Sequence, residues 1–122
     1  MAEVTMTVVD AVKAGILDVE GNASVENGDA AAASNWFMAN DGRTVLVFHA
    51  DAAGGDTITF AAVADKFGRT ETLAPVVSAG KVAILGPFNP ELWNNSDGEI
   101  VFALTSRNAA DQLLAVRVAN PT

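Results

Sequence analysis

The side chains best suited to chemistry in this chain are one histidine and fifteen carboxylic acids. His49 is the only histidine and there is no cysteine, so neither a pair of imidazoles nor a thiolate can hold a metal ion. A Ser-His-Asp triad would depend on His49, which lies among apolar neighbours, and no Gly-x-Ser-x-Gly elbow is present. No spacing singles out two acids as a general acid and base. We therefore expect a structural histidine, no cofactor and no enzymatic activity.

Two clusters of side-chain oxygens have the composition of a cation site. Asp51 and Asp56 flank a loop of alanine and glycine. The second cluster consists of Asn94, Asn95, Asp97 and Glu99. Ca²⁺ prefers carboxylate and carbonyl oxygens, but neither spacing matches an EF-hand loop. The sequence favours plain turns without a metal at both places and leaves a calcium site as the alternative.

The two tryptophans could act as stacking platforms for sugars if their rings were exposed. Trp36 precedes Phe37 and Met38, and Trp93 follows Leu92. An indole with apolar neighbours is usually part of a core or a protein interface. A carbohydrate-binding or adhesin module stays open as an alternative, and it requires an exposed indole.

Bulk composition restricts the class of partner. The chain has 122 residues, the length of one domain. Its net charge is −8 and its basic residues are scattered, which argues against binding to nucleic acid or to an anionic membrane. No apolar run approaches the roughly 18 residues of a membrane span, and no signal peptide is visible, so we expect synthesis in the cytoplasm. Charged residues make up 18%, below the roughly 25% of ordinary soluble domains, which favours surfaces that are covered by assembly.

Short alternating segments must position these side chains. β-Branched and aromatic residues alternate with polar ones, and Gly, Asn or Asp turns separate the segments. The expected strands are residues 4–10, 43–50, 57–63, 70–77, 81–85, 99–105 and 112–119. This pattern predicts an all-β fold, an antiparallel β-sandwich or jelly-roll-like domain of seven to eight strands. Residues 34–122 would form the sandwich, and residues 1–33 an N-terminal strand or arm that could pair with another chain.

The alternation also assigns faces to several strands. Residues 43–50 are apolar on both faces, which is typical of a central strand. Pro75 lacks an amide donor, so residues 70–77 should lie at a sheet edge. The side chains expected to face inward are Ile58, Phe60, Ala62, Leu114, Val116 and Val118. In residues 99–105, Ile100, Phe102 and Leu104 are expected to share one face.

The segment 84–95 is where the chain stops forming sheet. A Gly-Pro pair ends the preceding strand, and Asn89 with Pro90 has the residue types of a helix N-cap and first helical position. We expect one helical turn there. Phe88 and Trp93 should be buried in the fold or at a subunit contact.

Several short motifs follow one another in a fixed order along residues 35–118. They are Asn40-Asp41-Gly42-Arg43-Thr44-Val45-Leu46, Thr57-Ile58-Thr59-Phe60, Ala79-Gly80-Lys81-Val82, Gly86-Pro87-Phe88 and Asn95-Ser96-Asp97-Gly98. In their order and spacing the chain resembles virion structural proteins of tailed bacteriophages and prophages, in particular small β-sandwich proteins that decorate or cement the head. The resemblance implies a non-enzymatic protein on the capsid exterior, made in the host cytoplasm, that stabilises contacts between capsomers. Its partners would be the major capsid protein and copies of itself, as a homotrimer, with no nucleic acid and no membrane.

A cement protein needs an apolar contact surface and an arm that can pair with a neighbour. Strand addition uses backbone hydrogen bonds, and the β-branched start of this chain suits it. The predicted partner interface comprises Val4, Met6, Val8, Trp36, Phe37, Phe88 and Trp93. A phage tail subunit or a head–tail connector would have the same composition and stays open as an alternative.

Overall fold

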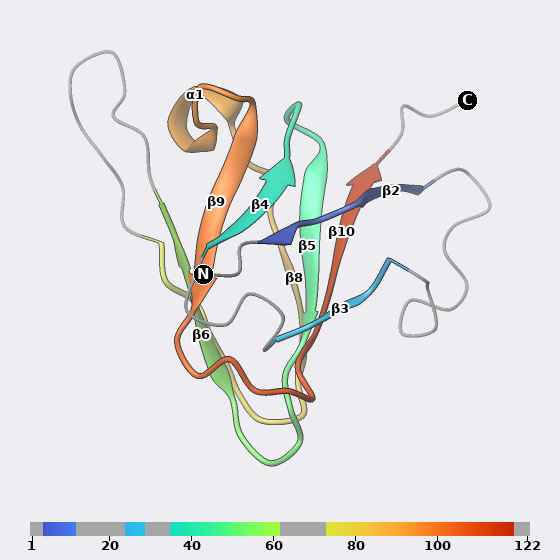
Figure 1. The fold of residues 1–122 in the computed structure, drawn as a ribbon, viewed down its shortest axis with the longest axis vertical. Helices are drawn as coiled ribbons and strands as arrows, with labels where there is room; N and C mark the ends of the chain where they lie inside the picture. The colour runs from blue at the N-terminus through green and yellow to red at the C-terminus, as the bar shows by residue number, and fades with distance from the viewer. Residues whose placement is uncertain (1–3, 12–23, 29–34, 62–72, 119–122) are drawn as a thin grey trace.

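The computed structural model describes residues 4–11, 24–28, 35–61 and 73–118. In this part of the chain two β-sheets pack against each other, and one short helix lies at one end (Figure 1). The elements are β1 (Val4–Thr5), β2 (Val8–Ala11), β3 (Glu26–Asn27), β4 (Trp36–Ala39), β5 (Thr44–His49), β6 (Asp56–Phe60), β7 (Val76–Val77), β8 (Val82–Leu85), α1 (Pro90–Trp93), β9 (Glu99–Leu104) and β10 (Gln112–Val118). The predicted strand ends at 62–63, 70–72 and 119, and residues 1–3, 12–23 and 29–33 of the predicted arm, lie outside the described residues.

The strand order confirms the all-β sandwich. The first sheet has the order β1-β4-β9-β6-β7 and the second β2-β10-β5-β8, while β3 pairs with the start of β10. From β4 onward, successive strands alternate between the sheets, apart from β6 and β7, which pair with each other. The described residues form ten strands, more than the seven to eight expected, because the first predicted strand is divided into β1 and β2, and because β3 and β4 lie outside the predicted strands.

The first predicted strand is divided between the two sheets. β1 runs parallel to β4, and β2 runs parallel to β10, so the sandwich is not purely antiparallel. Between β1 and β2, the Met6 amide donates to the Phe37 carbonyl at 2.8 Å, and the Met6 side chain is buried. The described start of the predicted arm therefore completes an edge of both sheets of its own chain.

Aromatic side chains fill one end of the core. Trp36 stacks on Phe102 with ring centroids 6.0 Å apart and planes 8° apart. Phe60 contacts Phe102 at 5.5 Å and Phe88 at 4.9 Å, and Phe88 meets the edge of Trp93 at 6.2 Å. The prediction that Phe88 and Trp93 are buried is confirmed, and they are buried in the fold itself. The inward face predicted for β6 is confirmed at Ile58 and Phe60, which lie in the core, while Ala62 lies outside the described residues. Ile100, Phe102 and Leu104, predicted to share one face of β9, also lie in the core.

The face predicted for β10 is wrong. Leu113 lies opposite Phe48 and Ala115 opposite Leu46, and these four residues belong to the core. Residues directly opposite each other point to the same side of a sheet, so Leu114, Val116 and Val118 point to the outer face. Leu114 and Val116 are nevertheless buried, whereas Val118 is 50% exposed.

Residues 86–95, the corner that follows β8, have the predicted local structure. The Asn89 side chain accepts a hydrogen bond from the Glu91 amide at 3.0 Å, and Pro90 opens α1. Gly86 has φ +109, which glycine adopts without strain. A Cβ at Gly86 would lie 2.8 Å from the Phe88 ring, so this glycine also allows Phe88 to fold back onto the core.

Candidate functional site

The residues predicted for a partner interface lie mostly inside the molecule. Met6, Trp36, Phe88 and Trp93 belong to the core cluster. Val4 and Val8 are half-buried and pack against that cluster, and Phe37 is half-buried. In this conformation these residues do not form one accessible surface. The two buried indoles also present no ring face on which a sugar could stack.

Asp56 connects two loops. Its side chain is buried and accepts hydrogen bonds from the amides of Thr57 at 2.8 Å, Ser106 at 2.7 Å and Arg107 at 3.0 Å. Arg107 has φ +53, a conformation uncommon for a residue with a side chain. The Asp56 carboxylate therefore holds the strained turn after β9 against the start of β6.

Asp111 lies next to Asp56 and has a perturbed pKa. Its Oδ1 accepts from the Asp51 amide at 2.7 Å, and its buried Oδ2 receives no hydrogen bond from an N–H group of the described residues. Burial, followed by the contact with the Asp56 carboxyl, raises the pKa of Asp111 to about 6. Gly28 packs directly on this carboxyl, because a Cβ there would lie 2.9 Å from Oδ2. Burial and the neighbouring Asp56 carboxyl therefore both favour the protonated form of Asp111.

Neither predicted cation cluster is assembled as a site. The Asp51 side chain accepts from the Ala53 amide at 2.9 Å, within its own loop. In the second cluster, the Asn95 side chain accepts from the amides of Asp97 at 2.9 Å and Glu99 at 3.0 Å. Within the described ranges, no group of three or more His, Cys, Asp or Glu side chains is placed to hold a metal ion.

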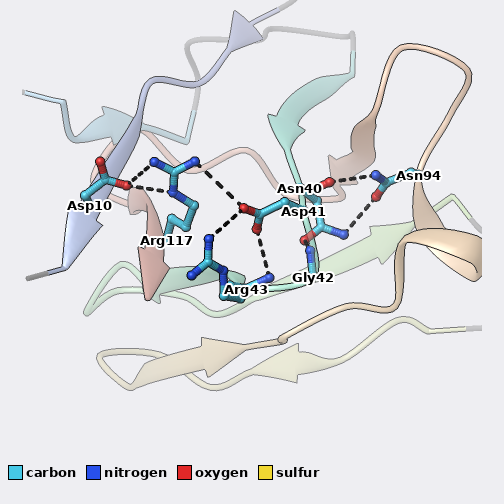
Figure 2. A network of polar contacts seen from close by, with 7 residues as sticks. All are labelled: Asp10, Asn40, Asp41, Gly42, Arg43, Asn94 and Arg117. Carbon is cyan, nitrogen blue, oxygen red and sulfur yellow. Dashed lines mark hydrogen bonds and ion pairs between the residues drawn. The ribbon is translucent and has the colours of Figure 1, made fainter. Parts of the chain in front are cut away.

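A pair of asparagines joins the corner to the turn after β4, as Figure 2 shows. The Asn40 side-chain amide donates to Asn94 Oδ1 at 2.8 Å and to the Phe88 carbonyl at 3.1 Å. The Asn94 side-chain amide donates back to the Asn40 carbonyl at 2.7 Å, and the Gly42 amide donates to Asn40 Oδ1 at 3.0 Å. Local sequence patterns do not reveal this pair, because the two residues are 54 positions apart.

Ion pairs lie beside these asparagines on the surface (Figure 2). Arg117 on β10 contacts Asp10 on β2 at 2.7 Å and Asp41 at 3.8 Å, and Asp41 also contacts Arg43 at 3.3 Å. A hollow of about 250 Å³ adjoins Arg117 and Asp41. Its charged groups already pair with one another, and exposed ion pairs of this kind contribute little to stability.

The outer face of the second sheet is apolar and partly open. A groove of about 270 Å³ crosses it. The residues that line it are Val25, Val47, His49, Val82, Ile84, Gln112, Leu113 and Leu114. None of them is Asp, Glu, Lys or Arg. His49, predicted to be structural, is half-buried and lines this groove.

The exposure of apolar side chains increases from β10 toward β8. Leu114 on β10 is buried, Val47 on β5 is half-buried, and Val82 and Ile84 on β8 are 61% and 69% exposed. Contiguous exposed apolar surface on a small domain is characteristic of a contact site. The candidate site is therefore this groove together with β8, referred to below as the β8 face.

No family model, curated protein or solved structure matches this chain. No helix among the described residues is long and apolar enough to cross a membrane.

Proposed function

We propose that this chain is a non-enzymatic structural protein of a tailed-phage virion. It decorates the outside of the capsid and stabilises contacts between capsomers, with the major capsid protein and copies of itself, as a homotrimer, for partners. The resemblance of residues 35–118 to small phage head proteins suggests this role. The observation that supports it best is the β8 face, an apolar groove that is lined by no Asp, Glu, Lys or Arg among the described residues, on a molecule with a net charge of −8.

The use of the polar side chains agrees with such a role. Asp56, Asp111 and Asn40 are buried and hold loops together. Asp10, Asp41 and the two arginines that contact them form ion pairs on the surface. These polar side chains thus make their contacts within the domain, and the apolar β8 face is left for contact with a partner. This arrangement suits a protein that binds to a shell.

The proposal is tested on purified virions and on heads that lack the protein. We expect the chain to be found in virions by mass spectrometry and on the head by electron microscopy. Heads without it should lose DNA at a lower temperature and under milder osmotic shock. Density on the tail or at the head–tail junction would show one of the two alternative locations instead. Unchanged stability of the depleted heads would contradict the stabilising role.

A matched pair of variants connects this role to the β8 face. Ile84→Asp places a charge on the face, and Val76→Asp places the same charge on β7, where Val76 is 73% exposed in the other sheet. We expect Ile84→Asp to reduce the occupancy of depleted heads at a fixed protein concentration by about tenfold or more, because an apolar contact would have to bury a charge. Val76→Asp should bind like the wild type. Equal loss in both variants would exclude the β8 face as the contact.

A further inference from the structure

The hydrogen-bond pattern of the second sheet shows which backbone groups of β8 are open. Ala50 donates to the Lys81 carbonyl at 2.9 Å, and these two residues lie opposite each other in the β5–β8 register. In an antiparallel pair, hydrogen-bonded and non-hydrogen-bonded positions alternate. Ala83 and Leu85 therefore direct their amides and carbonyls to β5. Val82 and Ile84 direct theirs away from it, to the open edge.

The other side of β5 gives the same alternation. Val118 donates to the Arg43 carbonyl at 2.9 Å, and these residues lie opposite each other in the β5–β10 register. The β5 residues bonded to β10 are then Val45, Val47 and His49, which leaves Leu46 and Phe48 bonded to β8. The two ladders give the same alternation along β5, and among the described strands β8 is the last of this sheet.

The open backbone groups belong to the two residues with exposed apolar side chains. Val82 and Ile84 point to the outer face beside the groove, while Ala83 and Leu85 pack against the core. Proteins usually protect such an edge with a charge, a proline or a bulge. Within β8 the sequence is Val-Ala-Ile-Leu, with none of these.

We infer that β8 pairs antiparallel with β8 of a second copy of this chain. A two-fold axis beside Ala83 places Val82 of one copy opposite Ile84 of the other, and the reverse. In each of these pairs, both residues then exchange N–H···O bonds across the new ladder. Their side chains meet on the same face, where apolar cross-strand pairs stabilise a sheet. This contact deepens the proposed function, since it rests on the copies of the chain as partners and specifies how two of them meet.

Charge favours a second copy at this edge over the other edges. Copies with a net charge of −8 repel each other, so they associate best where neither presents a carboxylate. β2, at the opposite edge of the sheet, carries Asp10, and β1 and β7 contain only two residues each. Next to β8 in the sequence, the charged residue is Lys81, directly before Val82. In the two-fold register Lys81 lies opposite Leu85 and not opposite another lysine.

The symmetry of this contact restricts the assemblies it can form. A two-fold contact is closed and joins copies in pairs. Alone it gives a dimer, and together with the expected trimer it links each trimer to others through two-fold contacts. The strand is short, so the interface lies at the small end of specific interfaces, and we expect a dissociation constant of about 10–100 μM. Attachment to a shell would raise the local concentration and compensate for this weakness.

Sedimentation of the purified protein over about 5 μM to 1 mM tests the contact directly. We expect reversible association into an even-numbered species. Ile84→Lys should weaken it by about tenfold or more, and Val76→Lys should leave it unchanged, with circular dichroism confirming that both variants fold. A monomer at the highest concentration, a trimer alone, or equal weakening by both lysines would overturn the inference.

Engineered thiols test the register, because the chain has no cysteine of its own. Ala83→Cys places two thiols across a non-hydrogen-bonded pair, where Cβ atoms are about 4.5–5.5 Å apart. We expect mild oxidation to link this variant into dimers faster than Val76→Cys, even though Val76 is far more exposed. Cross-linking at the same rate in both would overturn the register. A monomer that still binds purified heads would overturn only the self-pairing, and a dimer absent from virions would overturn only the capsid role.

Discussion

The carboxyl groups of Asp111 and Asp56 lie side by side. Asp111 accepts a hydrogen bond from the Asp51 amide, and Asp56 accepts one from the Ser106 amide. Two adjacent carboxylates repel each other, and a buried one is poorly solvated. Folding therefore favours the protonated form of Asp111, with a pKa of about 6 against 3.8 for an ordinary aspartate. The titration of the buried Asp111 should therefore make the free energy of unfolding depend on pH.

The sign of this dependence follows from the direction of the shift. Because the pKa of Asp111 is raised on folding, its contribution to stability is complete below about pH 4 and is lost as the pH rises through about 6. We expect Asp111→Asn to match the wild type near pH 4 and to be more stable at pH 7 by about 1–3 kcal/mol. Urea denaturation between pH 4 and pH 8 measures this difference. The exposed Asp97→Asn is the control, and a wild-type curve parallel to that of Asp111→Asn would contradict the assignment.

Asn40 and Asn94 bind the corner to the sheet through groups far apart in the sequence. We expect Asn40→Ala to lower the free energy of unfolding by about 1–3 kcal/mol, because it leaves the buried Phe88 carbonyl without its donor. In a double-mutant cycle with Asn94→Ala the two losses should not add, with a coupling of about 0.5–3 kcal/mol. Denaturant unfolding of the four proteins gives this coupling, and strict additivity would show that the pair acts independently.

Whether the sequence predicts the inner face of a strand depends on how strongly the two faces of that strand differ in burial. The inner face of β6 and the shared face of Ile100, Phe102 and Leu104 on β9 were predicted correctly, because in each strand one set of alternate residues is clearly more apolar. On β10 all residues from Leu113 to Val116 are buried, so alternation could not show which of them face the core. The division of the first strand at Met6 was also invisible, since the alternation continues through it. The β8 face combines β8, β5, β10 and Val25, and local patterns contain no information on which strands become neighbours.

Proline substitution tests the ladder assigned to β8 independently of any association. Ala83→Pro removes an amide bonded to β5, whereas Ile84→Pro removes one that faces the open edge. We expect Ala83→Pro to destabilise the fold by about 3 kcal/mol or more and Ile84→Pro by about 1 kcal/mol or less. Thermal unfolding at low protein concentration, where the chain is monomeric, separates the two. The reverse order would mean that the alternation is shifted by one residue.

For the whole molecule, the net charge of −8 opposes every contact between copies. The repulsion is long-ranged at low salt, since the Debye length is about 30 Å at 0.01 M and about 8 Å at 0.15 M. An apolar interface without acids changes little with salt, so screening should act mainly on this repulsion. We expect self-association to strengthen between these two salt concentrations, as measured by sedimentation. Weaker association at higher salt would indicate an interface built on ion pairs.

The parallel pairing of β2 with β10 determines how the domain responds to force. Val8 to Ala11 lie beside Ala115 to Val118 and run in the same direction, so the entry of β2 and the exit of β10 are at opposite ends of the pair. Tension that separates these two points loads the hydrogen bonds of the pair in shear, all at once, and not one after another as in a zipper. A domain anchored at these two points would therefore be mechanically stiff along that axis.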